Sequence, residues 1–106
     1  YIDDPLCGHL SSNRLWFDLL GGLLEISKRS SLAAVANDLP ILISGGALDP
    51  VGGAAALSRL AEAYRQSGNT AVSLKLYAAG RHEVLNDSNR DEVIADLDAV
   101  DESPEI

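Results

Sequence analysis

The chain has 106 residues, 46% of them hydrophobic, and its 16 acidic and 8 basic side chains give a formal charge of −8. This balance is typical of a globular domain, or of part of one, and argues against a disordered tail. The apolar stretches are interrupted well before the ~20 residues that a membrane span needs, and no segment resembles a signal peptide. We therefore expect no transmembrane segment.

The acidic excess lies near the C-terminus, where residues 86–106 contain 8 acidic side chains and one basic residue, Arg90. Binding to phosphate needs clustered Lys and Arg, so we expect no nucleic-acid partner. The acidic stretch is read as a solvated helix face and tail, with an acidic partner-binding tail as the alternative. The single cysteine, Cys7, cannot form an internal disulfide, which favours a reducing compartment and a cytoplasmic location.

Residues 1–12 are rich in turn and cap residues, which predicts a loop that leads into a helix. This helix begins at about Asn13, and its apolar side chains recur at helical spacing. They are Trp16, Leu19, Leu20, Leu23 and Leu24. A second, short helical turn is expected to be capped by Ser30 or Ser31 and to run through Val35.

The apolar run at residues 39–44, which Gly45 and Gly46 follow, predicts a strand buried on both faces. Residues 54–66 predict an amphipathic helix with a glycine-containing exit. Residues 71–77 alternate between apolar and polar side chains, as in a strand with one wet face, often an edge strand.

A last helix is expected to open at Asn89, where Glu92 would complete a capping box. Its apolar stripe would consist of Val93, Ile94, Leu97 and Val100. Strand, helix and strand in this order, joined by short connections, predict a right-handed crossover with parallel, adjacent strands. The fold class is therefore α/β.

Functional residues of such sheets gather in the loops after the carboxyl ends of the strands. Asp49 lies in the first of these loops and His82 in the second. Because adjacent strands lie ~4.8 Å apart, we expect a carboxylate oxygen of Asp49 within ~3.5 Å of a ring nitrogen of His82. Two alternatives stay open: Asp49 as a turn residue before Pro50, and His82 as a loop histidine bonded to Glu83.

Three segments of the chain resemble the C-terminal part of the α/β-hydrolase fold, more narrowly its lysophospholipase or monoacylglycerol-lipase-like branch. They are residues 39–51 (LPILISGGALDPV), 76–86 (LYAAGRHEVLN) and 89–93 (NRDEV). The resemblance extends over residues 1–100 and is most specific around His82. It implies one partial domain, divided into the end of a cap region and a helix (1–38), a strand-helix-strand-helix unit (39–100) and an acidic tail (101–106).

The same resemblance implies a serine carboxylic-ester hydrolase that acts on small or lipid-like acyl esters. Asp49 and His82 would be the acid and the base of a Ser-Asp-His triad. The family places the nucleophilic serine in a Gly-x-Ser-x-Gly elbow, and the 106 residues contain no such pentapeptide. We therefore expect the serine and the oxyanion hole on a segment outside this sequence.

The alternative is a non-catalytic remnant or interaction module. Two other motifs are incomplete in this sequence. The sequence contains no P-loop, and Asn86 occupies the position at which a zinc site of the His-Glu-x-x-His type would need a second histidine. We expect no cofactor and no metal. The open edge of the strand at 39–44 predicts self-association, or pairing with the rest of the fold.

Overall fold

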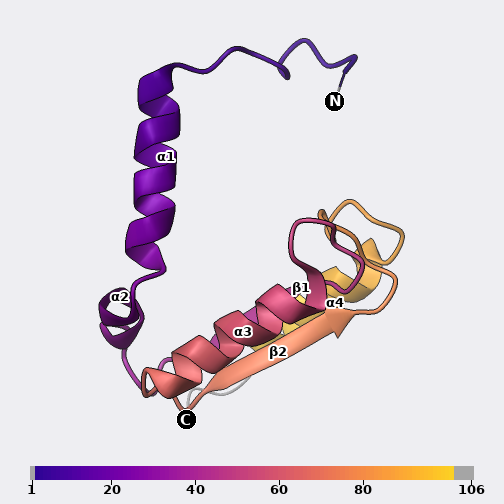
Figure 1. Ribbon diagram of the computed structural model, residues 1–106. Coiled ribbons are helices and arrows are strands. Elements are labelled where there is room, and N and C mark those ends of the chain that lie inside the picture. The colour runs from indigo at the N-terminus through magenta and orange to yellow at the C-terminus, as the bar shows by residue number, and fades with distance from the viewer. Residues whose placement is uncertain (1, 102–106) are drawn as a thin grey trace.

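The structure is a computed structural model that describes residues 2–101. Its helices and strands are, in chain order, α1 (Asn13–Ile26), α2 (Arg29–Ala33), β1 (Ile41–Gly46), α3 (Gly53–Gln66), β2 (Val72–Tyr77) and α4 (Arg90–Asp101) (Figure 1). No helix within residues 2–101 is long and apolar enough to cross a membrane. The predicted acidic tail at 101–106 lies outside the described residues, except for Asp101, which ends α4.

The two strands form the predicted crossover. β1 and β2 are adjacent and parallel, in a register that pairs Ile41 with Val72 and Gly46 with Tyr77. The intervening helix, α3, packs against both strands. The α/β class is therefore confirmed, and the carboxyl ends of both strands lie at the same edge of the sheet.

Different helices cover the two faces of this sheet. Gly45 faces Leu57 of α3, whereas Lys75 and Tyr77 on β2 contact Asp96 of α4. Neighbouring residues of a strand point to opposite faces, so the sheet is the middle layer of three, with α4 behind it in the view of Figure 1. The buried apolar side chains are contributed by every helix except α1 and by both strands. They are Leu32, Ile43, Ala61, Tyr77 and Val93.

The predicted boundaries of the first strand, 39–44, were shifted by two residues, whereas the second strand, predicted at 71–77, begins one residue later than expected. β1 begins at Ile41 because Pro40 has no N–H, and the first ladder bond runs from the Ile41 N–H to the Ala71 carbonyl at 2.9 Å. The two glycines expected to end the strand belong to it, because Gly45 and Gly46 keep their register with β2. Glycine therefore marks close packing here rather than a turn.

Two predicted helix caps were wrong. The residue that caps α2 is Lys28, and the Ser31 hydroxyl instead donates a hydrogen bond back to the Glu25 carbonyl of α1. The capping box expected at Asn89 is not formed, because Asn89 Oδ1 is buried without a hydrogen-bond partner in the described part of the chain.

The helix predicted from Asn13 is confirmed, and the Ser12 hydroxyl accepts a hydrogen bond from the Leu15 N–H at 3.1 Å. None of the residues of α1 is buried, and Trp16 and Phe17 are 52% and 73% exposed. Among the described helices and strands, α1 lies against α2 alone (Figure 1). Its apolar side chains are therefore open to solvent.

At the amino ends of the two strands, the buried side chain of Asn69 holds three segments together. Its amide Nδ2 donates to the carbonyls of Ala36 and Leu39, both at 3.0 Å, and its Oδ1 accepts from the Ala71 N–H at 2.9 Å. A buried amide with both ends bonded fixes the entry points of β1 and β2.

At the carboxyl ends, the two loops that follow the strands are joined by backbone hydrogen bonds. The Ala47 N–H donates to the Tyr77 carbonyl at 2.9 Å, and the Leu48 N–H donates to the Gly80 carbonyl at 3.0 Å. This approach requires glycine at position 46, where a Cβ atom would lie 2.2 Å from the Gly80 oxygen. The missing side chain of Gly46 thus lets the two loops touch.

We predict that Gly46→Ala destabilises the chain by at least about 2 kcal/mol, because the new methyl group meets backbone atoms that can move only by breaking the bond between the loops. Urea denaturation measures this change. The matched control is Gly22→Ala, since a Cβ at Gly22 in α1 would have no atom within 4 Å. That variant should be stabilised by about 0.5–1 kcal/mol through helix propensity. Equal effects of the two substitutions would contradict the prediction.

Candidate active site

Asp49 is positioned three residues after the end of β1, in the turn that leads into α3. Its Oδ1 accepts a hydrogen bond from the Val51 N–H at 2.8 Å, and its side chain is 19% exposed. Asp49 is therefore a turn residue before Pro50, as the alternative predicted, but only one of its two carboxylate oxygens is used in the turn. The other oxygen, Oδ2, is available to a second partner.

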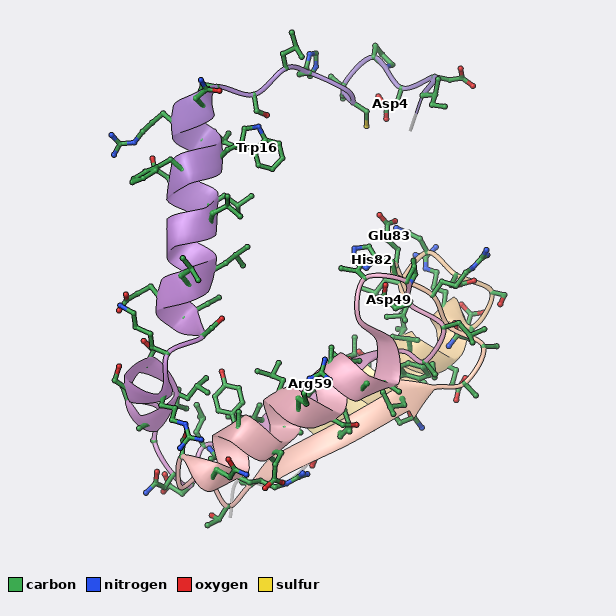
Figure 2. All side chains as sticks on the ribbon, in the orientation of Figure 1. Asp4, Trp16, Asp49, Arg59, His82 and Glu83 are labelled. Carbon is green, nitrogen blue, oxygen red and sulfur yellow. The ribbon has the colours of Figure 1, made fainter. Side chains whose placement is uncertain are left out.

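That partner is His82, which lies five residues after the end of β2. Figure 2 shows the two side chains facing each other from the two loops, and His82 Nδ1 lies 3.0 Å from Asp49 Oδ2. The predicted pairing distance is therefore confirmed. The alternative bond to Glu83 was wrong, because the side-chain hydrogen bond of His82 is the one to Asp49, while Glu83 Oε2 accepts from the side-chain amide of Asn86 at 2.9 Å.

The pair fixes the protonation of the imidazole. An ionised carboxylate only accepts hydrogen bonds, so the Nδ1 atom must carry the proton. In neutral His82, the lone pair is then on Nε2, which makes no hydrogen bond within residues 2–101. The His82 side chain is 62% exposed, so Nε2 is accessible to a reacting group.

Each member of the pair shifts the titration of the other. The hydrogen bond and the charge of Asp49 raise the pKa of His82 above its ordinary value. The hydrogen bond from His82 lowers the pKa of Asp49, and the Val51 N–H lowers it further. An imidazole whose charged form is stabilised in this way is suited to accept a proton from a nucleophile and to return it.

Asp87 lies in the same loop as His82 and was not among the predicted site residues. Its Oδ2 accepts from the Arg81 N–H at 2.9 Å, and its Oδ1 accepts from the Ser88 N–H at 2.8 Å. The signal that could have identified it is an acidic residue next to serine inside a long loop, which favours side-chain bonds to nearby backbone N–H groups.

The described chain supplies no nucleophilic elbow. Ser44 lies inside β1, paired with Lys75, and so it is not at a turn between a strand and a helix. No group of three or more His, Cys, Asp or Glu side chains among residues 2–101 could hold a metal ion. A hollow of about 290 Å³ lies between α2 and α3, lined by Arg29, Ala63 and Ser67, and it includes neither member of the pair.

We predict that the charged pair stabilises the fold within a defined pH window. Because the pKa of His82 is raised, its contribution is complete below the ordinary histidine value of 6.5 and is lost as the pH rises through the raised pKa. Because the pKa of Asp49 is lowered, its contribution is complete above 3.8 and is lost as the pH falls through the lowered pKa.

The stability difference between the wild type and Asp49→Asn should therefore be largest between pH 3.8 and 6.5. Urea denaturation as a function of pH measures it. NMR titration should also show a lower His82 midpoint in Asp49→Asn than in the wild type. A midpoint that the substitution leaves in place would mean that the two side chains do not interact in solution.

Comparison with known proteins agrees with this fold. A search of curated proteins and a search of solved structures gave no match. The profile of a family described as "Serine aminopeptidase, S33" matches residues 1–89, a segment that includes both strands, Asp49 and His82. The chain therefore belongs to the S33 serine aminopeptidase family of the α/β-hydrolase superfamily.

Proposed function

We propose that this chain supplies the acid, Asp49, and the general base, His82, of a Ser-Asp-His triad in a serine hydrolase that cleaves carboxylic esters. The observation that carries the proposal is the 3.0 Å hydrogen bond between Asp49 Oδ2 and His82 Nδ1 at the carboxyl ends of adjacent parallel strands. The family match supports an esterase-type α/β-hydrolase function. The serine would lie on a segment outside these 106 residues.

The proposed chemistry assigns one task to each ring nitrogen of His82. Nε2 takes the proton of the serine hydroxyl as that oxygen attacks the carbonyl carbon, and later gives the proton to the leaving alcohol. Nδ1–H stays bonded to Asp49, whose negative charge stabilises the imidazolium that forms. The oxyanion hole would come from the same outside segment as the serine.

The substrate class has two candidates. The sequence resemblance favours small or lipid-like acyl esters, as in lysophospholipases and monoacylglycerol lipases. The printed name of the matched family instead describes an aminopeptidase, which hydrolyses an amide at the amino end of a peptide. Both reactions are acyl transfers that use the same triad, so the side chains that bind the substrate, rather than Asp49 and His82, distinguish them.

We predict that, in the protein that contains this chain together with the serine-bearing segment, His82→Ala lowers kcat/KM by on the order of 10⁴-fold, and Asp49→Asn by a similar factor. Hydrolysis of p-nitrophenyl butyrate measures the esterase reaction, alanine p-nitroanilide the aminopeptidase reaction, and a lysophospholipid the lipid-like substrate. The substrate with the highest kcat/KM identifies the class.

The matched control for the histidine is His9→Ala, in the loop before α1, which should retain wild-type activity. Residues 1–106 alone should hydrolyse none of these substrates above the background of imidazole, because they lack the serine elbow. Full activity of His82→Ala would overturn the proposal. An upstream reading frame without a Gly-x-Ser-x-Gly pentapeptide would support the alternative of a non-catalytic remnant or interaction module.

We also propose that the chain alone pairs with a second copy of itself. The sheet has only two strands among the described residues, so β1 presents unpaired backbone groups along its outer edge. The large apolar side chains of α1 are 47–73% exposed. Exposed apolar surface of this extent is unusual for a soluble monomer.

Light scattering of residues 1–106 at micromolar concentrations should therefore give a dimer or a larger species. Leu24→Glu on α1 should shift the distribution toward the monomer, because it places a charge within the exposed apolar surface. Leu10→Glu, a matched change in the loop before α1, should leave it unchanged. A monodisperse wild-type monomer that melts cooperatively would contradict the prediction.

A further inference from the structure

The loop that carries His82 has little regular structure of its own. It connects the end of β2 at Tyr77 to the start of α4 at Arg90. The Gly80 carbonyl fixes its first part by accepting the Leu48 N–H at 3.0 Å. Beyond that point, no backbone N–H or carbonyl of His82 itself is bonded in the described structure, so the neighbouring residues must fix the position of the imidazole.

The loop is held at a first point by the bond between Leu48 and Gly80, and Asp87 holds it at a second point. Its side chain is only 11% exposed, and each of its carboxylate oxygens accepts one backbone N–H, from Arg81 and from Ser88. The Arg81 guanidinium also forms an ion pair with the Asp87 carboxylate, with Nε 3.6 Å from Oδ2. These donors lower the pKa of Asp87, which keeps the carboxylate charged and acceptor-only near neutral pH.

These two hydrogen bonds hold both ends of one peptide group, the one between Gly80 and Arg81, just before His82. The carbonyl of Gly80 bonds to the loop that carries Asp49, and the next N–H along the chain, that of Arg81, bonds to Asp87. Asp87 therefore closes residues 81–87 into a compact loop with His82 near its start. Without this closure, the imidazole would have to lose more conformational entropy to meet Asp49.

We propose that Asp87 is a positioning residue for His82, one that holds the His82 loop closed so that Nδ1 meets Asp49. This inference rests on the proposed role of His82 as the triad base. It adds a residue that touches neither the substrate nor the imidazole and acts through the backbone N–H of Arg81.

The experiment compares two substitutions that each remove one acidic charge without changing side-chain shape, Asp87→Asn and Asp91→Asn. In Asp87→Asn, the new NH₂ group faces a backbone N–H that needs an acceptor, so one of the two loop bonds is lost. Asp91 is exposed in the first turn of α4 and serves as the charge-matched control.

The readout is the NMR titration midpoint of His82 in residues 1–106, which needs neither substrate nor serine. The charged groups that shift the pKa of His82 are Asp49 and Glu83, and neither variant changes these two residues. We expect the His82 midpoint to fall in Asp87→Asn toward its value in the urea-unfolded chain. In Asp91→Asn it should move by less than about 0.2 pH unit at 0.15 M salt, because exposed charges are screened.

Backbone amide signals of Ile43 and Leu74 report whether the sheet stays folded, which separates loss of the loop from loss of the fold. If Asp87→Asn unfolds the chain, Asp87→Ser takes its place, since a serine hydroxyl can accept the neighbouring Ser88 N–H but is too short to reach Arg81.

A wild-type His82 midpoint in a folded Asp87 variant would overturn the positioning role, whatever the complete protein hydrolyses. Conversely, a lowered midpoint would stand even if that protein failed to cleave esters. The two proposals can therefore fail separately.

Discussion

The close approach of the two strand-end loops is the constraint on which the site depends. Parallel pairing of β1 and β2 brings the loops to one edge of the sheet, but pairing alone leaves their backbones a strand spacing apart. Gly46 removes the side chain that would stand between them, and the Leu48 N–H then reaches the Gly80 carbonyl. Asp49 follows Leu48 by one residue and His82 follows Gly80 by two, so this one backbone contact brings both side chains together.

The electrostatics of the pair depend on how far water reaches its two side chains. Asp49 is mostly covered, and one of its oxygens is held by the Val51 N–H, whereas His82 is largely exposed. Water around the imidazole weakens the attraction between the two charges, because the effective dielectric constant near a protein surface is high. A triad base works best where water is excluded, so a covering segment would strengthen the pair as well as supply the serine.

Local patterns predicted much of this fold and the main feature of the site. The alternation at 71–77, the helical spacing at 54–66 and the crossover rule were enough to place Asp49 and His82 at one edge of the sheet. What the patterns missed depends on contacts that form only in the folded loops. Gly46 reads as the end of a strand until the loop that it touches is known, and Asp87 had no predicted role because a local pattern does not encode the loop path that brings its carboxylate to the Arg81 N–H.

If the proposed function is correct, a single cause explains why both α1 and His82 are exposed. An isolated helix of 14 residues is marginal in water, and Gly21 and Gly22 weaken this one further, so α1 needs tertiary contacts to be stable. In Figure 2, Trp16 on α1 stands apart from Asp49 and His82 in the loops that follow the strands. A covering segment that buried the apolar side of α1 and reached the carboxyl edge of the sheet would stabilise the helix and bring a nucleophile to His82 Nε2. Stability and catalysis would then depend on the same contact, which would account for an acid and base in good geometry beside a helix of which no residue is buried within residues 2–101.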